Sequence, residues 1–73
     1  SEGLKNNEGE DVSSIEIKKK LEEFIIEEDK KRPLTDQTLS ELLKEKGYIV
    51  ARRTVAKYRE QLEVPVARMR KEL

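Results

Sequence analysis

Two adjacent arginines open the stretch of this chain whose residue types could do chemistry. Arg52 and Arg53 begin the run RRTVAKYREQL, and Lys57 follows one helical turn after Arg53. A guanidinium group is a planar fork of donors that matches the O6 and N7 acceptors of guanine, and a good bidentate contact discriminates between bases by about 1–3 kcal/mol. These residue types therefore indicate recognition of an anionic surface or of base edges.

Helical geometry separates these side chains from the residues that would hold the segment in place. At 100° per residue, Val55, Tyr58 and Leu62 fall within about 40° of Ala51, and these four residues form the predicted inward stripe. The remaining side chains are Arg53, Ala56, Lys57 and Glu60 on the far side, Arg52 and Arg59 on one flank, and Thr54 and Gln61 on the other.

Most charged helical faces are simply solvated, because a basic patch alone is a weak signal. Two features favour a binding face here. The cations cluster in the N-terminal half of the helix, where the helix dipole disfavours positive charge, so helix stability does not explain them. Ala56 presents only a methyl group, which lets another surface come close or contact a thymine methyl.

We predict that base edges are read by Arg52, Arg53, Ala56, Lys57 and Glu60. Glu60 has two interpretations of equal weight: it accepts from a cytosine amino group, or it holds a neighbouring cation in place. Phosphates would be held by backbone amides at a helix N-terminus and by Thr54, Arg59, Lys44 and Lys46. For the two lysines, ordinary helix C-terminal charge is at least as good an explanation.

The first element that must position this face is a helix predicted over residues 13–28. Ser13 and Glu16 have the capping-box spacing, and Val12 and Ile17 lie where a hydrophobic staple would place them. The predicted buried face of this helix consists of Ile17, Leu21, Phe24 and Ile25.

A second helix is predicted over residues 35–46 and a third over residues 51–62. Leu34 is the staple residue of the second helix and Thr35 its N-cap, while Gly47 provides the stop. The fold class is therefore all-α, with a helix-turn-helix, which seats a recognition helix in the major groove of DNA.

The three helices form one domain over residues 12–63, with a tail on each side. Residues 1–11 are polar without an apolar period and are predicted to be a flexible leader. Residues 64–73 have little to bury and are predicted to be a flexible tail, with solvated cations at Arg68, Arg70 and Lys71.

Composition excludes several classes of protein. The chain has no histidine and no cysteine, which removes the usual general base and any thiolate metal ligand. No apolar run approaches the roughly 20 residues of a membrane span. We expect no enzyme activity, no catalytic residue, no cofactor or metal, no membrane or small-molecule partner, and a cytoplasmic location. Residues 1–47 hold 13 acidic and 9 basic side chains, and residues 48–73 hold 3 and 7, which predicts an anionic partner for the second half.

The run ARRTVAKYRE, residues 51–60, resembles the ten-residue signature near the C-terminus of the bacterial sigma-54 family of RNA polymerase sigma factors. All ten positions agree with that pattern. The preceding PLTDQTLSELLKEKGYIV, residues 33–50, is similar to the segment that comes before the signature. The resemblance thus covers residues 33–60, and the first helix fits the same domain without identifying it.

The resemblance implies a DNA-binding domain that recognises the GG-containing minus-24 promoter element through a helix in the major groove. It places the family's functional arginines at Arg52 and Arg53. It also implies a bacterial nucleoid location and contact with RNA polymerase core through regions of the parent protein that this chain lacks. One departure is Arg53 itself, since the common pattern counted from Gly47 expects an apolar residue there; the turn should be longer than in repressors. The alternative is a helical protein-interaction module of the transcription machinery.

Overall fold

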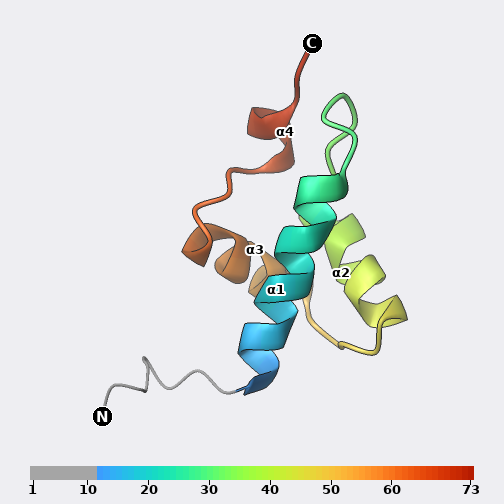
Figure 1. Cartoon of the computed structure of the whole chain (residues 1–73), viewed down its shortest axis with the longest axis vertical. Coiled ribbons are helices and arrows are strands. Elements are labelled where there is room, and N and C mark those ends of the chain that lie inside the picture. The colour runs from blue at the N-terminus through green and yellow to red at the C-terminus, as the bar shows by residue number, and fades with distance from the viewer. Residues whose placement is uncertain (1–11) are drawn as a thin grey trace.

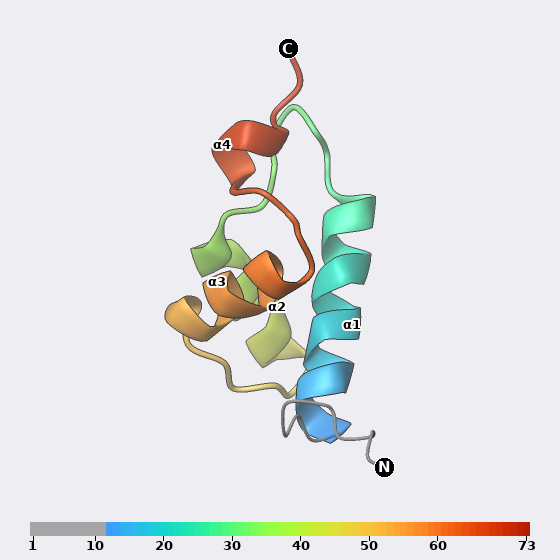
Figure 2. The same ribbon diagram turned by 90° about the vertical axis from the view of Figure 1, so that its left-hand side faces the viewer.

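A computed structural model describes residues 12–73, and the predicted leader, residues 1–11, lies outside them. Every regular element in the described part is a helix, as the sequence predicts. The elements are α1 (Val12–Glu27), α2 (Asp36–Glu45), α3 (Arg52–Gln61) and the short α4 (Ala67–Arg70). The long α1 lies along one side of the molecule, α2 and α3 pack against it and against each other, and α4 lies near the C-terminal end of α1 (Figures 1 and 2).

The core is a small cluster contributed by the three longer helices and by the connection between α2 and α3. Its buried members are Leu21, Ile25, Leu39, Leu43, Val50 and Val55. Each helix supplies residues at helical spacing, so one apolar stripe per helix meets the other two. Ile17, Phe24, Tyr58 and Leu62 pack at the edge of this cluster, in agreement with the predicted inward positions.

The predicted first helix is present as α1, one residue earlier in the chain than expected, but its predicted capping box does not form. The helix begins at Val12, so Ser13 lies inside its first turn and does not cap it. Val12 is 74% exposed and therefore forms no staple with Ile17. The capping-box spacing is a weak signal, since the pattern contains only two specified residues.

Both ends of α2 follow the sequence signals. The N–H of Thr38 donates to the hydroxyl oxygen of Thr35 over 3.1 Å, which is the predicted N-cap contact. At the other end Gly47 has φ +95°, with hydrogen bonds from Gly47 N to Lys44 O and from Tyr48 N to Leu43 O. This pair of bonds is the Schellman arrangement, in which a left-handed residue closes the helix.

Residues 46–51 connect α2 to α3, which is longer than the turn of repressor-type helix-turn-helix proteins, as expected from Arg53. The hydroxyl of Ser40 donates to the carbonyl of Val50 over 2.6 Å and so fixes the last part of this connection to α2. Ala51 is the N-cap of α3 and is exposed, which corrects its predicted inward position. Because a cap residue has an extended backbone, it does not follow the 100° helical step, and Val50 is buried instead.

The C-terminal segment also differs from the prediction of a flexible tail at 64–73. Val64 packs against the core, α4 forms at Ala67–Arg70, and the N–H of Glu72 donates to Lys30 O over 2.8 Å. The side chain of Arg70, expected to be solvated, is only 6% exposed. A buried carboxylate, described below, explains this docking.

Candidate nucleic-acid interface

The outward face of α3 carries the charged side chains that the sequence assigned to it. Arg52, Arg53, Lys57 and Glu60 are exposed, and Ala56 and Thr54 are half-buried. The face is held in position from behind by Val55, which is fully buried against the core. A further contact with α1 comes from the hydroxyl of Tyr58, which lies 3.1 Å from that of Ser14.

A hollow of about 360 Å³ lies beside this face, between α3 and the beginning of α2. Six residues line it, three from each element: Thr35, Asp36, Gln37, Arg52, Arg53 and Ala56. Ala56 contributes only a methyl group to this lining, which suits the expected close approach of another surface. The fold therefore brings the two adjacent arginines to the N-terminal end of another helix.

The N-terminus of α2 adds positive potential to the arginine side of this hollow. The first backbone N–H groups of a helix have no partner within the helix, and the helix dipole is positive there. Thr35 uses its hydroxyl for the N–H of Thr38. The amides that precede Thr38 belong to Asp36 and Gln37, which line the hollow. This arrangement suits an anionic group such as a phosphate.

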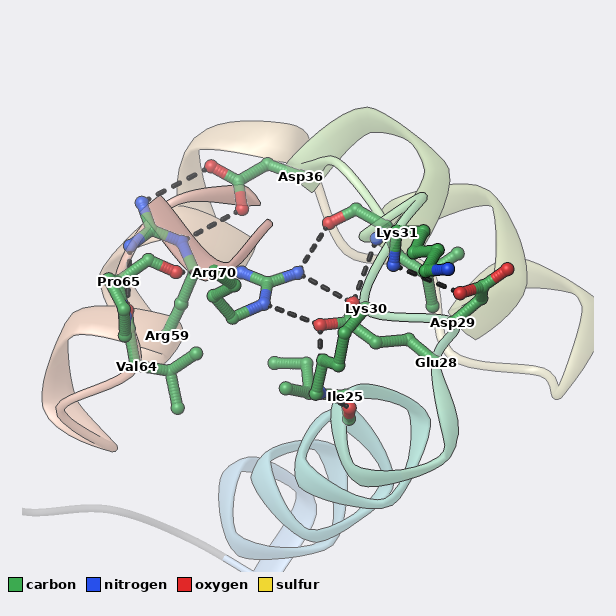
Figure 3. A network of polar contacts seen from close by, with 11 residues as sticks. Ile25, Glu28, Asp29, Lys30, Lys31, Asp36, Arg59, Val64, Pro65 and Arg70 are labelled. Atoms are coloured by element: carbon green, nitrogen blue, oxygen red, sulfur yellow. Dashed lines mark hydrogen bonds and ion pairs between the residues drawn. The ribbon is translucent and has the colours of Figure 1, made fainter. Parts of the chain in front are cut away.

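Asp36 would oppose an anion in this place, but Arg59 neutralises it. The Nε of Arg59 donates to Oδ1 of Asp36 over 2.9 Å, and Nη2 donates to Oδ2 over 3.3 Å (Figure 3). The Nη1 of Arg59 donates to the carbonyl of Val64 over 2.8 Å. The carboxylate of Asp36 thus receives a bidentate contact from the side away from solvent.

This geometry corrects the predicted role of Arg59 as a phosphate contact. The residue is 5% exposed and its guanidinium already holds three protein acceptors. The sequence contained a signal for this burial. On the helical wheel Arg59 lies only about 40° from Val55, the centre of the buried stripe, which is within the width of an apolar face.

The two lysines of α2 lie elsewhere. Lys44 is in the last turn of α2 and Lys46 is its C-cap, both exposed. A ten-residue helix is about 15 Å long, so these side chains begin at the opposite end of α2 from the hollow. The structure thus brings together Arg52, Arg53 and Ala56, but it does not bring Lys44 and Lys46 to them.

Three residues that the sequence did not assign to the site also line the hollow: Thr35, Asp36 and Gln37. The sequence predicts Thr35 only as an N-cap, and the other two only as part of the second helix. Their position at the N-terminus of the first helix of the helix-turn-helix was the available signal. None of the described residues forms a cluster of acidic side chains able to hold a metal ion. No helix in residues 12–73 has the length and apolar character to cross a bilayer.

A core-anchored helix that follows another helix across a connection and exposes its charged face is the arrangement of the helix-turn-helix class of DNA-binding domains. Comparison with known families agrees. Residues 1–72 match the model of the sigma-54 DNA-binding domain, and the chain belongs to this family. The resemblance found in residues 33–60 is thereby confirmed, and the chain is a domain of a transcription factor rather than an enzyme.

Similar proteins occur in several bacteria. The chain is 48% identical over 65 residues to the RNA polymerase sigma-54 factor of Acinetobacter guillouiae, and 46% identical over 65 residues to that of Escherichia coli. It is 48% identical over 62 residues to the RNA polymerase sigma-54 factor of Bacillus subtilis. These matches cover 84–89% of this chain and 14% of the length of each relative.

Proposed function

We propose that this domain binds the GG-containing minus-24 element of sigma-54 promoters, with α3 in the major groove. The observation that supports this most is the single hollow lined by Arg52, Arg53 and the first turn of α2. An arginine beside a helix N-terminus can read a guanine edge while the helix amides hold the adjacent phosphate. Base reading and backbone positioning would then be supplied from the two sides of one concave surface.

Roles for the individual side chains follow from their exposure. Arg53 and Arg52 would meet the guanines, and Lys57 the next base pair or a phosphate, since all three are exposed. Ala56 would allow the close approach, and Glu60 would either accept from a cytosine amino group or orient a cation beside it. Thr54 remains a proposed phosphate contact.

Lys44 and Lys46 are proposed as peripheral backbone contacts, at a distance from the hollow. Both are exposed near the turn that precedes α3. They would add to attraction of the duplex without sequence preference.

In the parent protein, this domain would bring a sigma factor to its promoter in the bacterial nucleoid. The relatives are named RNA polymerase sigma-54 factors, and contact with RNA polymerase core would use regions outside the matched 14%. The alternative, a helical protein-interaction module, predicts that no promoter duplex is bound at moderate salt. The exposed arginines beside a helix N-terminus favour DNA.

The proposal is tested by measuring the affinity of the domain for two duplexes, one with the GG element and one with the two guanines replaced. Arg53→Ala is expected to weaken binding to the GG duplex by about 1–3 kcal/mol and to leave binding to the altered duplex nearly unchanged. The difference arises because only the first duplex offers the O6 and N7 pair.

The matched control is Lys19→Ala, which removes an exposed cation from α1. It should reduce neither affinity nor discrimination. Full discrimination by the Arg53→Ala variant would show that another residue reads the guanines. Absence of binding by the unaltered domain to either duplex would reject the proposed function.

A further inference from the structure

Four exposed cations lie at the end of the molecule where α1 ends, at some distance from the reading face of α3. Lys31 and Arg32 belong to the connection between α1 and α2, and Arg68 and Lys71 belong to the C-terminal segment. The two segments involved, residues 28–35 and 64–73, together contain six cations and three acids. Figures 1 and 2 both show α4 beside the α1–α2 connection at this end.

Arg70 is the anchor that brings the C-terminal cations to this place. Its Nε and Nη2 donate to the two carboxylate oxygens of Glu28 over 2.7 and 2.8 Å. The side chain of Glu28 is fully buried, and that of Arg70 is 6% exposed. A bidentate pair from which water is excluded fixes both the position and the orientation of the segment that carries it.

The backbone bond from Glu72 N to Lys30 O, 2.8 Å long, brings the two segments into direct contact. Lys71 and Lys31 are the chain neighbours of the two bonded residues, so their backbones lie side by side. Of the three acids, the buried Glu28 is paired with Arg70 and Lys30, whereas Asp29 and Glu72 are exposed, so four exposed cations stand against two exposed acids. The exposed surface is therefore predominantly positive.

Contacts of the buried Arg70 connect this end of the molecule to the start of α2. The Nη2 of Arg70 donates to the carbonyl of Leu34 over 2.7 Å, two residues before Asp36. Arg70 and Arg59 also bind the consecutive carbonyls of Pro65 and Val64 (Figure 3). A chain of short contacts thus links α4, the α1–α2 connection and the first turn of α2.

We propose that Lys31, Arg32, Arg68 and Lys71 form a second DNA-binding surface, the flank surface, which holds phosphates of the same duplex beyond the bases read by α3. This inference rests on the proposed function. A ten-residue helix reaches only about 15 Å, whereas the phosphates of a duplex continue along both strands. The flank surface would add contacts with DNA phosphates without reading the base sequence.

The test uses three duplexes that share the GG element: one long on both sides, and two shortened to the element on one side or the other. Binding of the unaltered domain and of the double variant Arg68→Ala/Lys71→Ala is measured at several salt concentrations. On the long duplex the variant should bind about tenfold more weakly, with a salt slope smaller by about 1–2, because phosphate contacts are lost. On one of the shortened duplexes the two proteins should bind alike.

The control is Lys19→Ala/Lys20→Ala, which removes the same number of cations from α1. The melting temperature of each variant shows whether it is folded, and since Arg68 and Lys71 are exposed, no change is expected. Equal affinity and salt slope for the variant and the unaltered domain on the long duplex would overturn the flank surface, as would an equal loss on all three duplexes. The proposed function is tested by a separate measurement, the GG discrimination of Arg53→Ala, so the two proposals can fail independently.

Discussion

Arg53 and Arg59 stand on the same helix six residues apart, and the fold uses them in opposite ways. Arg53 is exposed at the hollow, while Arg59 is 5% exposed and bridges Asp36 to the carbonyl of Val64. The planar fork of arginine serves both purposes, because it can pair with a base edge outside or with a carboxylate and a carbonyl inside. Burial, not residue type, decides which partner each one meets.

At the residue scale, Arg59→Lys separates these two roles. An ammonium group keeps the charge but cannot bridge Asp36 and Val64 with the same geometry. We expect the free energy of unfolding, measured in urea, to fall by about 2 kcal/mol. This loss is smaller than that from removing one partner of a buried ion pair, because lysine keeps the positive charge. The matched change Arg53→Lys, on the exposed face, should leave it unchanged. Unchanged stability of Arg59→Lys together with weaker DNA binding would instead support the phosphate contact predicted from the sequence.

At the element scale, α2 and α3 end in the same hydrogen-bond arrangement but with different residues. Gly47 ends α2 at φ +95°, whereas Glu63 ends α3 at φ +61°. Glu63 N donates to Glu60 O and Val64 N to Arg59 O, so the bonds of the Schellman arrangement are complete. A residue with a Cβ is strained in this left-handed region, by about 1 kcal/mol. This strained turn places the carbonyl of Val64 within hydrogen-bond distance of the Arg59 guanidinium.

Introducing glycine at position 63 and removing it from position 47 should therefore change the free energy of unfolding in opposite directions. Glu63→Gly is expected to raise the free energy of unfolding by up to about 0.5 kcal/mol, after the greater freedom of glycine in the unfolded chain is subtracted from the relieved strain. Gly47→Ala should lower it by about 1 kcal/mol. Apart from the residues adjacent in the chain, nothing lies within 4 Å of the place that a Cβ would occupy at Gly47, so the loss is conformational rather than a clash with the rest of the fold. Urea titration of both variants gives the comparison, and equal signs would contradict it.

At the scale of the whole molecule, the C-terminal segment is held to the α1–α2 connection by one buried carboxylate. Glu28 accepts hydrogen bonds from Arg70, from the N–H of Leu34 and from Lys30. These contacts, above all those of Arg70, outweigh the cost of burial and lower the pKa of Glu28 from 4.5 to about 2. The segment that carries the flank surface is therefore attached by an interaction that needs an ionised glutamate.

A lowered pKa predicts acid sensitivity with a definite sign. The folded protein binds the proton of Glu28 less readily than the unfolded chain, so its contribution is complete above about pH 4.5 and is lost as the pH falls toward 2. The contribution is on the order of 3 kcal/mol. Unfolding free energies from pH 6 to pH 3 should show the unaltered domain losing its advantage over Glu28→Gln as the pH falls. Parallel curves for the two proteins would rule this out.

The positions of the helices follow from local signals that the sequence contains. Thr35 and Gly47 delimit α2 through bonds to residues three to five positions away, and Val55, Tyr58 and Leu62 follow the helical period. The exposure of Arg53 and Lys57 could be predicted for the same reason, since they lie opposite that stripe. Where local rules were applied to a pattern that was too short, as at Ser13, the prediction failed.

By itself the sequence thus determined the three longer helices, the face that α3 exposes and, through a ten-residue signature, the family. The helical period placed Arg59 beside the apolar stripe, but only the tertiary structure supplied its carboxylate partner, and only the tertiary structure docked Arg70 and α4. The partners of these arginines, Asp36 and Glu28, lie 23 and 42 residues away in the chain. No helical period relates residues so far apart, and a cation is solvated by default until the fold places a carboxylate beside it.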